Sequence, residues 1–312
     1  MTISESVERL PADLADPTEK GPRRRRIPFH TGRPTRSRLL AGWARHAVTI
    51  AVLVVMLYPI IWMINASFTP SAQIGQSLLP FTGDFTWENY AAGLTSTATL
   101  NFGRFFLNSF VLALLSVVGN VVACTLTGYA FARLDFPFKR TLFAVLMGTL
   151  LLPYQVTIVP QYILFNELGW LNTYLPLVVP KFLATDAFFV FLTVQFVRGL
   201  PRELDEAARL DGCGDWGIFR RVVVPLLGPA IATTAMFTFI ATWNDFLGPR
   251  LYISDTALYT VPQGLVQFVD STGQSSIGAL FAMATLSITP LIAFFLASQR
   301  LLTQGIATTG LK

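Results

Sequence analysis

Six long apolar segments set the strongest limit on how this chain can fold. They cover residues 47–64, 105–131, 141–166, 177–197, 226–243 and 277–298. A helix needs roughly 20 mostly apolar residues to cross a membrane, because the hydrocarbon core is about 30 Å thick and each residue rises about 1.5 Å. Only the fourth segment carries charge, at Lys181 and Asp186, and the third is longer than one span needs. The segments predict an all-α, multi-pass membrane protein with six transmembrane helices.

The composition agrees with this prediction. Hydrophobic residues make up 53% of the chain and charged residues only 13%, whereas about 25% of an ordinary soluble domain is charged. A chain this apolar is expected to have a lipid bilayer around it, and we do not expect nucleic acid among its partners.

The basic residues predict the orientation of the chain, because Lys and Arg are retained on the cytoplasmic side of short loops. Of the 23 Lys and Arg residues, ten precede the first segment, three lie between the second and third, five lie between the fourth and fifth, and two follow the sixth. The loops on the opposite side carry only Arg104 and Arg250. Both termini are therefore predicted to be cytoplasmic.

The residues before the first segment form a basic tail. They are rich in Pro, Arg, Glu and Asp and poor in large apolar side chains, a composition typical of disorder. The run Arg23–Arg26 resembles part of a twin-arginine export signal, but it lies too far from the first apolar stretch. We expect residues 1–44 to be a disordered cytoplasmic tail and residues 45–312 to be the membrane domain.

No catalytic or metal-binding set is expected in this chain. Cys124 lies in the second segment and Cys213 in the loop between the fourth and fifth, and His30 and His46 are equally isolated, so neither a disulfide nor a metal framework is implied. The phosphate-binding pattern G-x-x-x-x-G-K-[ST] does not occur. ATP hydrolysis by this chain is therefore excluded.

One charged loop, residues 198–225, stands out between two apolar segments. Pro201 suits the first turn of a helix, and Gly212 can end that helix in a left-handed conformation. These signals predict a short helix over residues 202–210. Asp215 is expected to cap a second helix over residues 215–221, and Pro225 is expected to bend the chain into the fifth span.

Two interpretations of this loop are open. Any cytoplasmic loop collects basic residues, and a capped amphipathic helix can simply float at the lipid headgroups. That interpretation explains the arginines of the loop. It does not explain the small residues Ala207, Ala208 and Gly212, which let another surface approach closely.

At these residues the loop resembles the signature of ABC importer permeases. The signature has Glu-Ala-Ala, a Gly four positions after the second Ala, and an Ile-x-Leu-Pro end. Here it reads Glu206-Ala207-Ala208, then Gly212, then Val222-Val223-Val224-Pro225. Val222 and Val224 replace the usual Ile and Leu.

The resemblance extends over most of the chain from about Arg45, and it is closest in kind to the maltose-type, MalG-like carbohydrate permeases. Further similar motifs are "ENY" at Glu88–Tyr90, "NS" at Asn108–Ser109, "GYAFARLDFPFKR" at Gly128–Arg140 and "WNDF" at Trp243–Phe246. The C-terminal "QRLLTQGIATTGLK" is also similar to the end of these permeases.

The resemblance implies a non-catalytic transport subunit with the type I ABC importer permease fold, located in the bacterial inner membrane. Such a chain pairs with a paralogous permease and forms half of a pathway for sugars of the di- or oligosaccharide class. An extracytoplasmic solute-binding protein delivers the solute. Two separate ABC subunits bind ATP and Mg²⁺, so this chain itself needs no cofactor.

The resemblance also implies that the loop is a coupling loop, which transmits movement from one ATPase subunit. In it, Glu206 would pair with a basic group of the ATPase, and Gly212 would set the angle of the helix. The residues expected to serve this coupling are Glu203, Glu206, Ala207, Ala208, Asp211, Gly212 and Pro225.

Polar residues within spans are energetically costly, and they often mark solute pathways. The candidates are Gln155, Gln161, Lys181, Asp186, Asn244 and Asp245. For Lys181 and Asp186 a structural ion pair is an equally good explanation. For Asn244 and Asp245 the alternative is a role in packing or gating.

Two other classes of protein are compared with the importer. A secondary transporter needs its own coupling-ion site, typically carboxylates at the midplane, and usually more than six spans. Asp186 alone is weak support for such a coupling-ion site. A membrane enzyme needs a cluster of nucleophile, base or metal ligands, and no such cluster is visible.

Overall fold

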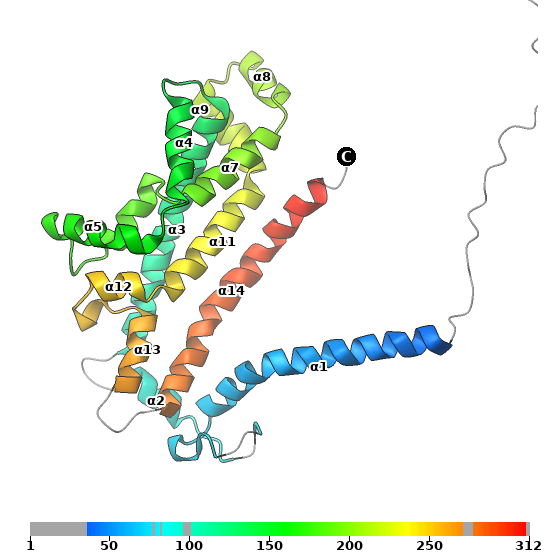
Figure 1. The fold of residues 1–312 in the computed structure, drawn as a ribbon, viewed down its shortest axis with the longest axis vertical. Coiled ribbons are helices and arrows are strands. Elements are labelled where there is room, and N and C mark those ends of the chain that lie inside the picture. Colours follow the sequence, from blue (N-terminus) through cyan, green and yellow to red (C-terminus); the bar gives the residue numbers. More distant parts are fainter. Residues whose placement is uncertain (1–35, 77–78, 82, 96–100, 271–276, 310–312) are drawn as a thin grey trace, which may run out of the picture. The chain divides into compact units, whose positions relative to one another are not determined.

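The fold is that of a computed structural model, which describes residues 36–76, 79–81, 83–95, 101–270 and 277–309 (Figure 1). By its internal contacts the chain divides into two units, Met1–Met56 and Leu57–Lys312, with the division inside helix α1 (Arg36–Ser67). Of the first unit, the structure describes only residues 36–56, which form the beginning of α1. All other elements belong to the second unit.

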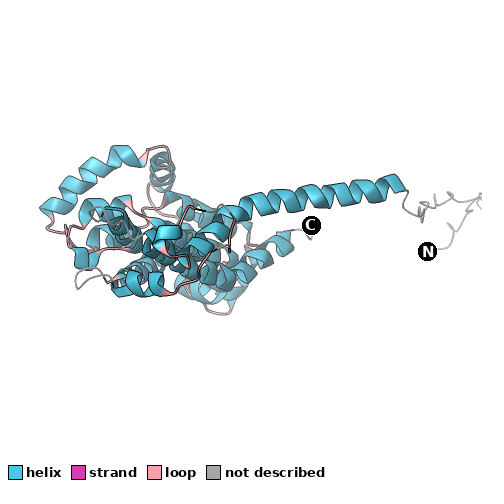
Figure 2. Ribbon diagram, turned by 90° about the horizontal axis from the view of Figure 1, so that it is seen from below, coloured by secondary structure: helices cyan, strands magenta, loops and turns pink. Residues whose placement is uncertain are grey.

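Helices are the only regular structure within the described ranges (Figure 2). After α1 the α-helices are α2 (Glu88–Thr95), α3 (Phe102–Arg133), α4 (Lys139–Thr149), α5 (Tyr154–Glu167), α6 (Leu175–Val178), α7 (Ala187–Gly199), α8 (Glu203–Leu210), α9 (Asp215–Ile218), α10 (Val224–Leu226), α11 (Gly228–Asn244), α12 (Leu247–Tyr252), α13 (Val261–Asp270) and α14 (Ile277–Thr309). The 3-10 helices are η1 (Ser71–Gln73), η2 (Val179–Leu183) and η4 (Thr256–Leu258), and η3 (Phe219–Val223) is a π-helix.

Four stretches are long and apolar enough to cross a membrane, namely Gly42–Ser67, Phe102–Arg133, Leu175–Gly199 and Ile277–Gln299. They contain four of the six predicted segments. The other two segments fall in bent helix pairs, α4 with α5 and Asp215–Leu226 with α11, so the described residues contain up to six spans if each pair counts as one.

The third predicted segment, 141–166, is therefore not one straight helix. It consists of α4 and α5, whose axes differ by 104°. The break falls at Pro153, which precedes α5 and has no N–H to donate to a preceding turn. This explains why the apolar run is longer than a single span needs.

Helix α1 begins at Arg36, so residues 36–44, predicted as part of the tail, are helical. The apolar segment 47–64 is the inner part of this longer helix. Helical backbone satisfies its own hydrogen bonds, and the helix can therefore continue past the apolar residues. Residues 1–35, for which disorder is predicted, lie outside the described residues.

Helix α3 is the central element of the second unit. It packs against α7 and α11, and α11 packs against α14 (Figure 1). A Cβ atom at Gly128 would lie 2.5 Å from the side chain of Thr193, so only glycine allows this close approach of α3 and α7. Two buried clusters lie along α3, one around Phe105 and Trp243 and one around Val194 and Phe219.

A buried side-chain hydrogen bond joins α3 to α11. The Nδ2 of Asn120 donates to the Oγ1 of Thr238 over 2.8 Å, and both side chains are buried. The Oδ1 of Asn120 accepts the S–H of Cys124 over 3.1 Å. Polar side chains between spanning helices hold them together because lipid offers no replacement partner.

Replacing Thr238 with valine preserves the shape of the side chain and removes the acceptor for Asn120. We expect the Thr238→Val chain to lose about 0.5–1.5 kcal/mol of stability, because a buried amide loses a partner within the membrane. The apparent melting temperature of the detergent-solubilised protein measures this loss.

Thr233→Val is the matched control, because the Thr233 hydroxyl bonds only to the carbonyl oxygen of Pro229 in its own helix. If both substitutions lowered the melting temperature equally, the hydrogen bond between α3 and α11 would stabilise the protein no more than a bond within one helix.

Candidate functional site

The charged loop folds around α8 as its sequence predicts. The helix ends at Leu210, and Gly212, two residues later, has a φ of +82°, a left-handed conformation that L side chains rarely adopt. The N–H of Gly212 donates to the carbonyl oxygen of Arg209 over 3.0 Å, and that of Cys213 to the carbonyl oxygen of Ala208 over 2.9 Å. This is a Schellman ending, and it confirms the predicted helix and its glycine stop.

The second helix of the loop differs from its prediction. Gly214 is the N-cap of α9, and Asp215 is the first residue of the helix instead of its cap. The Asp215 carboxylate instead lies 3.0 Å from the Nη2 of Arg209, and more than half of each side chain is exposed. The predicted cap at Asp215 was wrong because the extended backbone that precedes the helix belongs to Gly214, and the Asp215 side chain pairs with Arg209 instead.

The predicted helix 215–221 is also interrupted, since α9 ends at Ile218 and a π-helix, η3, follows. Pro225 has no N–H for the carbonyl of Arg221, and one residue earlier the N–H of Val224 donates to the carbonyl oxygen of Phe219. The axis then turns by 74° before α11. The bend expected at Pro225 falls two residues later, at Leu227, because Pro225 lies inside α10 and the break comes after Leu226.

Most residues expected to serve coupling lie on the exposed side of the loop. Ala208 is an exception, because it is only 8% exposed and packs in the buried cluster around Phe219. Leu210 is 91% exposed, and it was not predicted from the sequence. The exposed residues are Glu203, Glu206, Ala207, Asp211, Gly212 and Pro225.

A second candidate site is a cavity of about 620 Å³ between broken helices. Its walls come from the junction of α4 and α5, from η2 and the start of α7, and from the residues that follow α11. Within the fourth span the helix is interrupted at Ala184, which has a φ of +53°, and α7 starts after Asp186. Irregular backbone at membrane depth is tolerated where it lines such a cavity.

Three charged side chains line this cavity among the described residues, namely Lys181, Asp186 and Asp245. The Nζ of Lys181 lies 2.9 Å from the Oδ2 of Asp186, and each side chain is less than one-third exposed. The structural ion pair considered for Lys181 and Asp186 therefore exists, and it lies in the wall of the cavity.

Asp245 is held by the backbone that follows α11. Its Oδ1 accepts the N–H of Gly248 over 3.1 Å. Burial raises the pKa of the Asp245 carboxyl, and the N–H groups of Gly248 and Leu247 and the charge of Lys181 oppose this rise only in part. Burial also raises the pKa of Tyr252 to about 12, so its phenol stays protonated even above the usual tyrosine pKa of about 10.

The structure separates the predicted pathway residues into two groups. Gln161, Lys181, Asp186 and Asp245 line the cavity, whereas Gln155 and Asn244 are not in its lining. Asn244 is exposed and donates to the carbonyl oxygen of Ile240 in its own helix over 2.8 Å.

Several polar lining residues were not predicted. They are Thr149, Tyr154, Thr157, Thr185 and Tyr252. Prolines were the available sequence signal, since a proline in an apolar run marks a possible break, and Pro153 and Pro180 lie near these residues.

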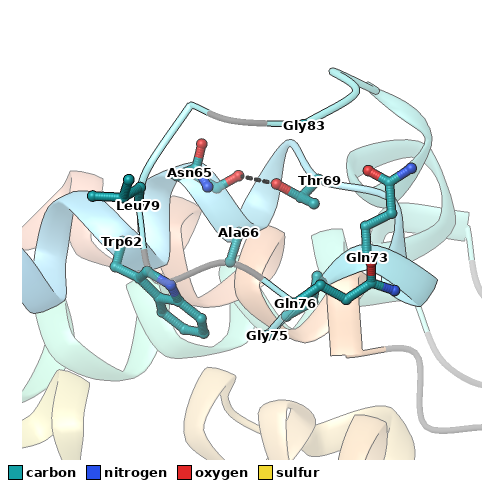
Figure 3. A pocket seen from close by; sticks show the side chains of 10 residues that line it. Trp62, Asn65, Ala66, Thr69, Gln73, Gly75, Gln76, Leu79 and Gly83 are labelled. Atoms are coloured by element: carbon teal, nitrogen blue, oxygen red, sulfur yellow. Dashed lines mark hydrogen bonds between the residues drawn. The ribbon is translucent and has the colours of Figure 1, made fainter.

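A much smaller cavity, of about 70 Å³, lies at the end of α1 (Figure 3). Its polar groups already have partners: the Oγ1 of Thr69 donates to the carbonyl oxygen of Asn65 over 2.9 Å, and the Nε2 of Gln73 donates to Asp84 over 2.8 Å. Small-molecule pockets usually hold about 300–1,000 Å³, so this cavity is too small for a sugar.

Comparisons with known proteins agree with the sequence resemblance. The family described as "Binding-protein-dependent transport system inner membrane component" matches residues 125–308. The diacetylchitobiose uptake system permease protein NgcG of Streptomyces coelicolor is 30% identical, over 82% of this chain and 84% of that protein. The trehalose/maltose transport system permease protein MalG of Thermococcus litoralis is 31% identical, over 84% and 94%.

A third relative is the sn-glycerol-3-phosphate transport system permease protein UgpE of Brucella abortus, 32% identical over 85% of this chain and 95% of that protein. Among solved structures, a bacterial ABC transporter involved in the import of the acidic polysaccharide alginate has a chain with the same fold. Its TM-score is 0.75 at 21% identity, over 86% of this chain and 99% of that one.

The left-handed conformation at Gly212 gives a direct test of the loop. We expect Gly212→Ala to destabilise the end of α8 by about 1 kcal/mol, because an L residue is strained there. Trypsin should then cleave after Arg209 about five times faster, since cleavage follows the population of the open loop. The rate is measured by limited proteolysis of the detergent-solubilised protein.

Gly214→Ala is the matched control, because Gly214 has a φ of −76° and, like Gly212, has open space where a Cβ would stand. Equal cleavage rates in the two variants would mean that the left-handed turn at Gly212 does not stabilise the end of α8.

Proposed function

The chain belongs to the family of binding-protein-dependent transport system inner membrane components, and from this premise we propose how its two sites work. As a member of this family it is a multi-pass transport permease of the bacterial inner membrane and not an enzyme. In our proposal it forms half of the pathway of an ATP-driven importer for sugars of the di- or oligosaccharide class. The loop around α8 couples that pathway to a separate ATPase.

The exposure of α8 is the observation that carries the coupling role. Glu203 and Glu206 are exposed near the start of the helix, and Leu210 is 91% exposed at its end. A large apolar side chain beside carboxylates in a polar loop suits a protein partner with an apolar cleft and basic groups. In this proposal Glu206 pairs with such a basic group, and the Schellman turn at Gly212 fixes the angle of the helix.

The cavity between the broken helices supports the transport role. Its volume of about 620 Å³ lies within the usual range for small-molecule sites. Tyr154 and Tyr252 offer aromatic faces and hydroxyl groups, and Gln161 and Thr185 offer further polar groups. Such a lining suits a sugar, which has apolar ring faces and many hydroxyls.

The charges of the cavity favour a neutral solute. Lys181, the one cation among the described lining residues, is already paired with Asp186. Asp245 adds a second acidic group, so the described lining has two carboxylates and one cation. This wall therefore has no unpaired positive charge for a phosphate or a uronate, and we propose neutral sugars in preference to glycerol phosphate or acidic polysaccharides.

The partners in this proposal are a paralogous permease, two ABC subunits that bind ATP and Mg²⁺, and an extracytoplasmic solute-binding protein. A stripe of exposed apolar residues on α3 suits the paralogous permease or lipid. Its members recur at helical spacing and are Leu107, Val111, Leu114, Val118 and Val122.

Purification of the tagged chain from detergent-solubilised native membranes tests the proposal. We expect the native chain to bring down an ATPase and a second permease. Glu206→Ala and Gly212→Trp should lose most of the ATPase while keeping the second permease, because both changes act on the surface that the ATPase contacts. Mass spectrometry and an ATPase assay of the eluate measure both outcomes.

Glu167→Ala serves as a control, since it removes a carboxylate at the end of α5, away from the loop. A native chain that purifies alone and transports without ATP would favour a secondary transporter instead.

Uptake by a strain lacking the chain tests the solute class and the pathway. The radiolabelled probes are maltose, trehalose, diacetylchitobiose, arabino-oligosaccharides, glycerol 3-phosphate and alginate oligomers. We expect loss of uptake of a neutral sugar. Complementation with Asp245→Ala should restore that uptake about ten-fold less well than the native chain, because a charged hydrogen-bonding group is lost from the wall.

Asn244→Ala is the matched variant, one residue away and not in the lining of the cavity, and it should restore uptake fully. If the strain lacking the chain lost uptake of only the anionic probes, that result would contradict the neutral-sugar proposal. Equal effects of the two alanine variants would contradict the proposed pathway.

A further inference from the structure

Arg133, the last residue of α3, reaches two other elements at once. Its Nε lies 2.8 Å from the Oδ2 of Asp205 in α8, and its Nη2 donates to the carbonyl oxygen of Leu200, just after α7, over 2.8 Å. The side chains of Arg133 and Asp205 are only 7% and 15% exposed. One guanidinium therefore joins α3, the end of α7 and the coupling helix.

This pair differs from the other ion pairs that hold exposed parts of the chain. Asp135, the partner of Lys139, is fully exposed, and Arg209 and Asp215 are both more than half exposed. Exposed pairs contribute little, whereas removal of one partner from a buried pair leaves an uncompensated charge. The N–H of Arg133 Nε does not point along its contact with Asp205, so charge, more than a directed hydrogen bond, makes this contact.

A second link lies one turn earlier on α3. The hydroxyl of Tyr129 donates to the carbonyl oxygen of Asp215 in α9 over 3.2 Å, and the ring of Tyr129 packs on Phe219 with the centroids 5.1 Å apart. A cavity of about 400 Å³ separates the end of α3 from the rest of the loop. The side chains of Tyr129 and Arg133 line this cavity and connect α3 to α9 and α8.

The two routes out of α8 differ in their continuity. Toward α11 the chain passes through the π-helix η3 and a 74° bend. Toward α3 it meets an uninterrupted helix of 32 residues that contains no proline. Near its other end α3 holds the segment before α13, since the Nδ2 of Asn108 donates to the carbonyl oxygens of Ala257 and Tyr259, each over 3.0 Å.

We infer that Arg133 is a positioning residue that fixes the coupling helix to α3. Movement imposed on α8 then reaches the central helix directly, in addition to the covalent route through Pro225, and continues along α3 to the segment held by Asn108. The inference rests on the proposed function only in taking that movement to come from an ATPase.

Distances between two spin labels test this link in the purified complex in nanodiscs. The labels are placed at Leu126→Cys, on α3 two turns before Arg133, and at Arg202→Cys, next to α8; both native side chains are exposed. Cys213 is replaced by serine, and Cys124 is fully buried and remains unlabelled. Pulsed electron paramagnetic resonance is recorded without nucleotide and after trapping with ADP and vanadate.

With the native pair we expect one narrow distance distribution that is the same in both states. Asp205→Asn should widen it at least about two-fold and let the distance change on trapping, because Arg133 then lacks its counter-charge. Arg133→Lys keeps the charge but loses the fork that also reaches Leu200, and it should widen the distribution less. Asp135→Asn makes the same chemical change at a fully exposed carboxylate and should leave the distances unchanged.

Equal widths for the native chain, Asp205→Asn and Arg133→Lys would overturn the inference. So would a distance that changes on trapping even with the native pair, because α8 and α3 would then move separately. The amount of ATPase that co-purifies with the native chain is measured in the same samples. Its absence would refute the proposed function, while the widths without nucleotide still decide whether Arg133 fixes α8 to α3.

Discussion

Within hydrocarbon every backbone N–H and C=O group must find a partner inside the protein, and the rest of this structure depends on that constraint. It makes helices the form of every predicted span. The constraint also means that a break in a helix needs other partners for its backbone groups, and such breaks occur at Pro153, at Ala184 and before α11. The first two breaks meet around one cavity, where polar groups freed from the helices can face solute or water.

Several of the motifs that resemble those of sugar permeases link distant elements of this structure. Asn89 of "ENY" donates to the carbonyl oxygens of Ser67 and Thr69 at the end of α1. Ser109 of "NS" accepts the N–H of Val261 at the start of α13, and Trp243 of "WNDF" donates to the carbonyl oxygen of Ser287 in α14. The first two links satisfy backbone groups at helix ends, and the third joins α11 to α14, so each motif has a packing role.

The sequence predicted those features that depend on local chemistry. Apolar length located the spans, Gly212 located the end of α8, and the loop motif indicated the family that the comparisons confirm. It could not predict the cavity, because Tyr154 and Tyr252 lie about one hundred positions apart and only tertiary packing brings them to one wall. Asn244 and Asp245 are equally good candidates in the sequence, but a step of one residue turns a helix by about 100°. Only Asp245 therefore lies in the lining of the cavity.

The π-helix η3, between α9 and α10, accommodates an extra residue on the way from the loop to the fifth span. A π turn holds about one residue more than an α turn, and here it takes up that residue between Phe219 and Val223. With one residue fewer, the same stretch closes as a regular α-helix and the helices on either side keep their phase, whereas a second lost residue would rotate α9 by about 100° relative to α10. The connection between α8 and the fifth span therefore has room for a change of one residue in length without a change in the face that α8 presents.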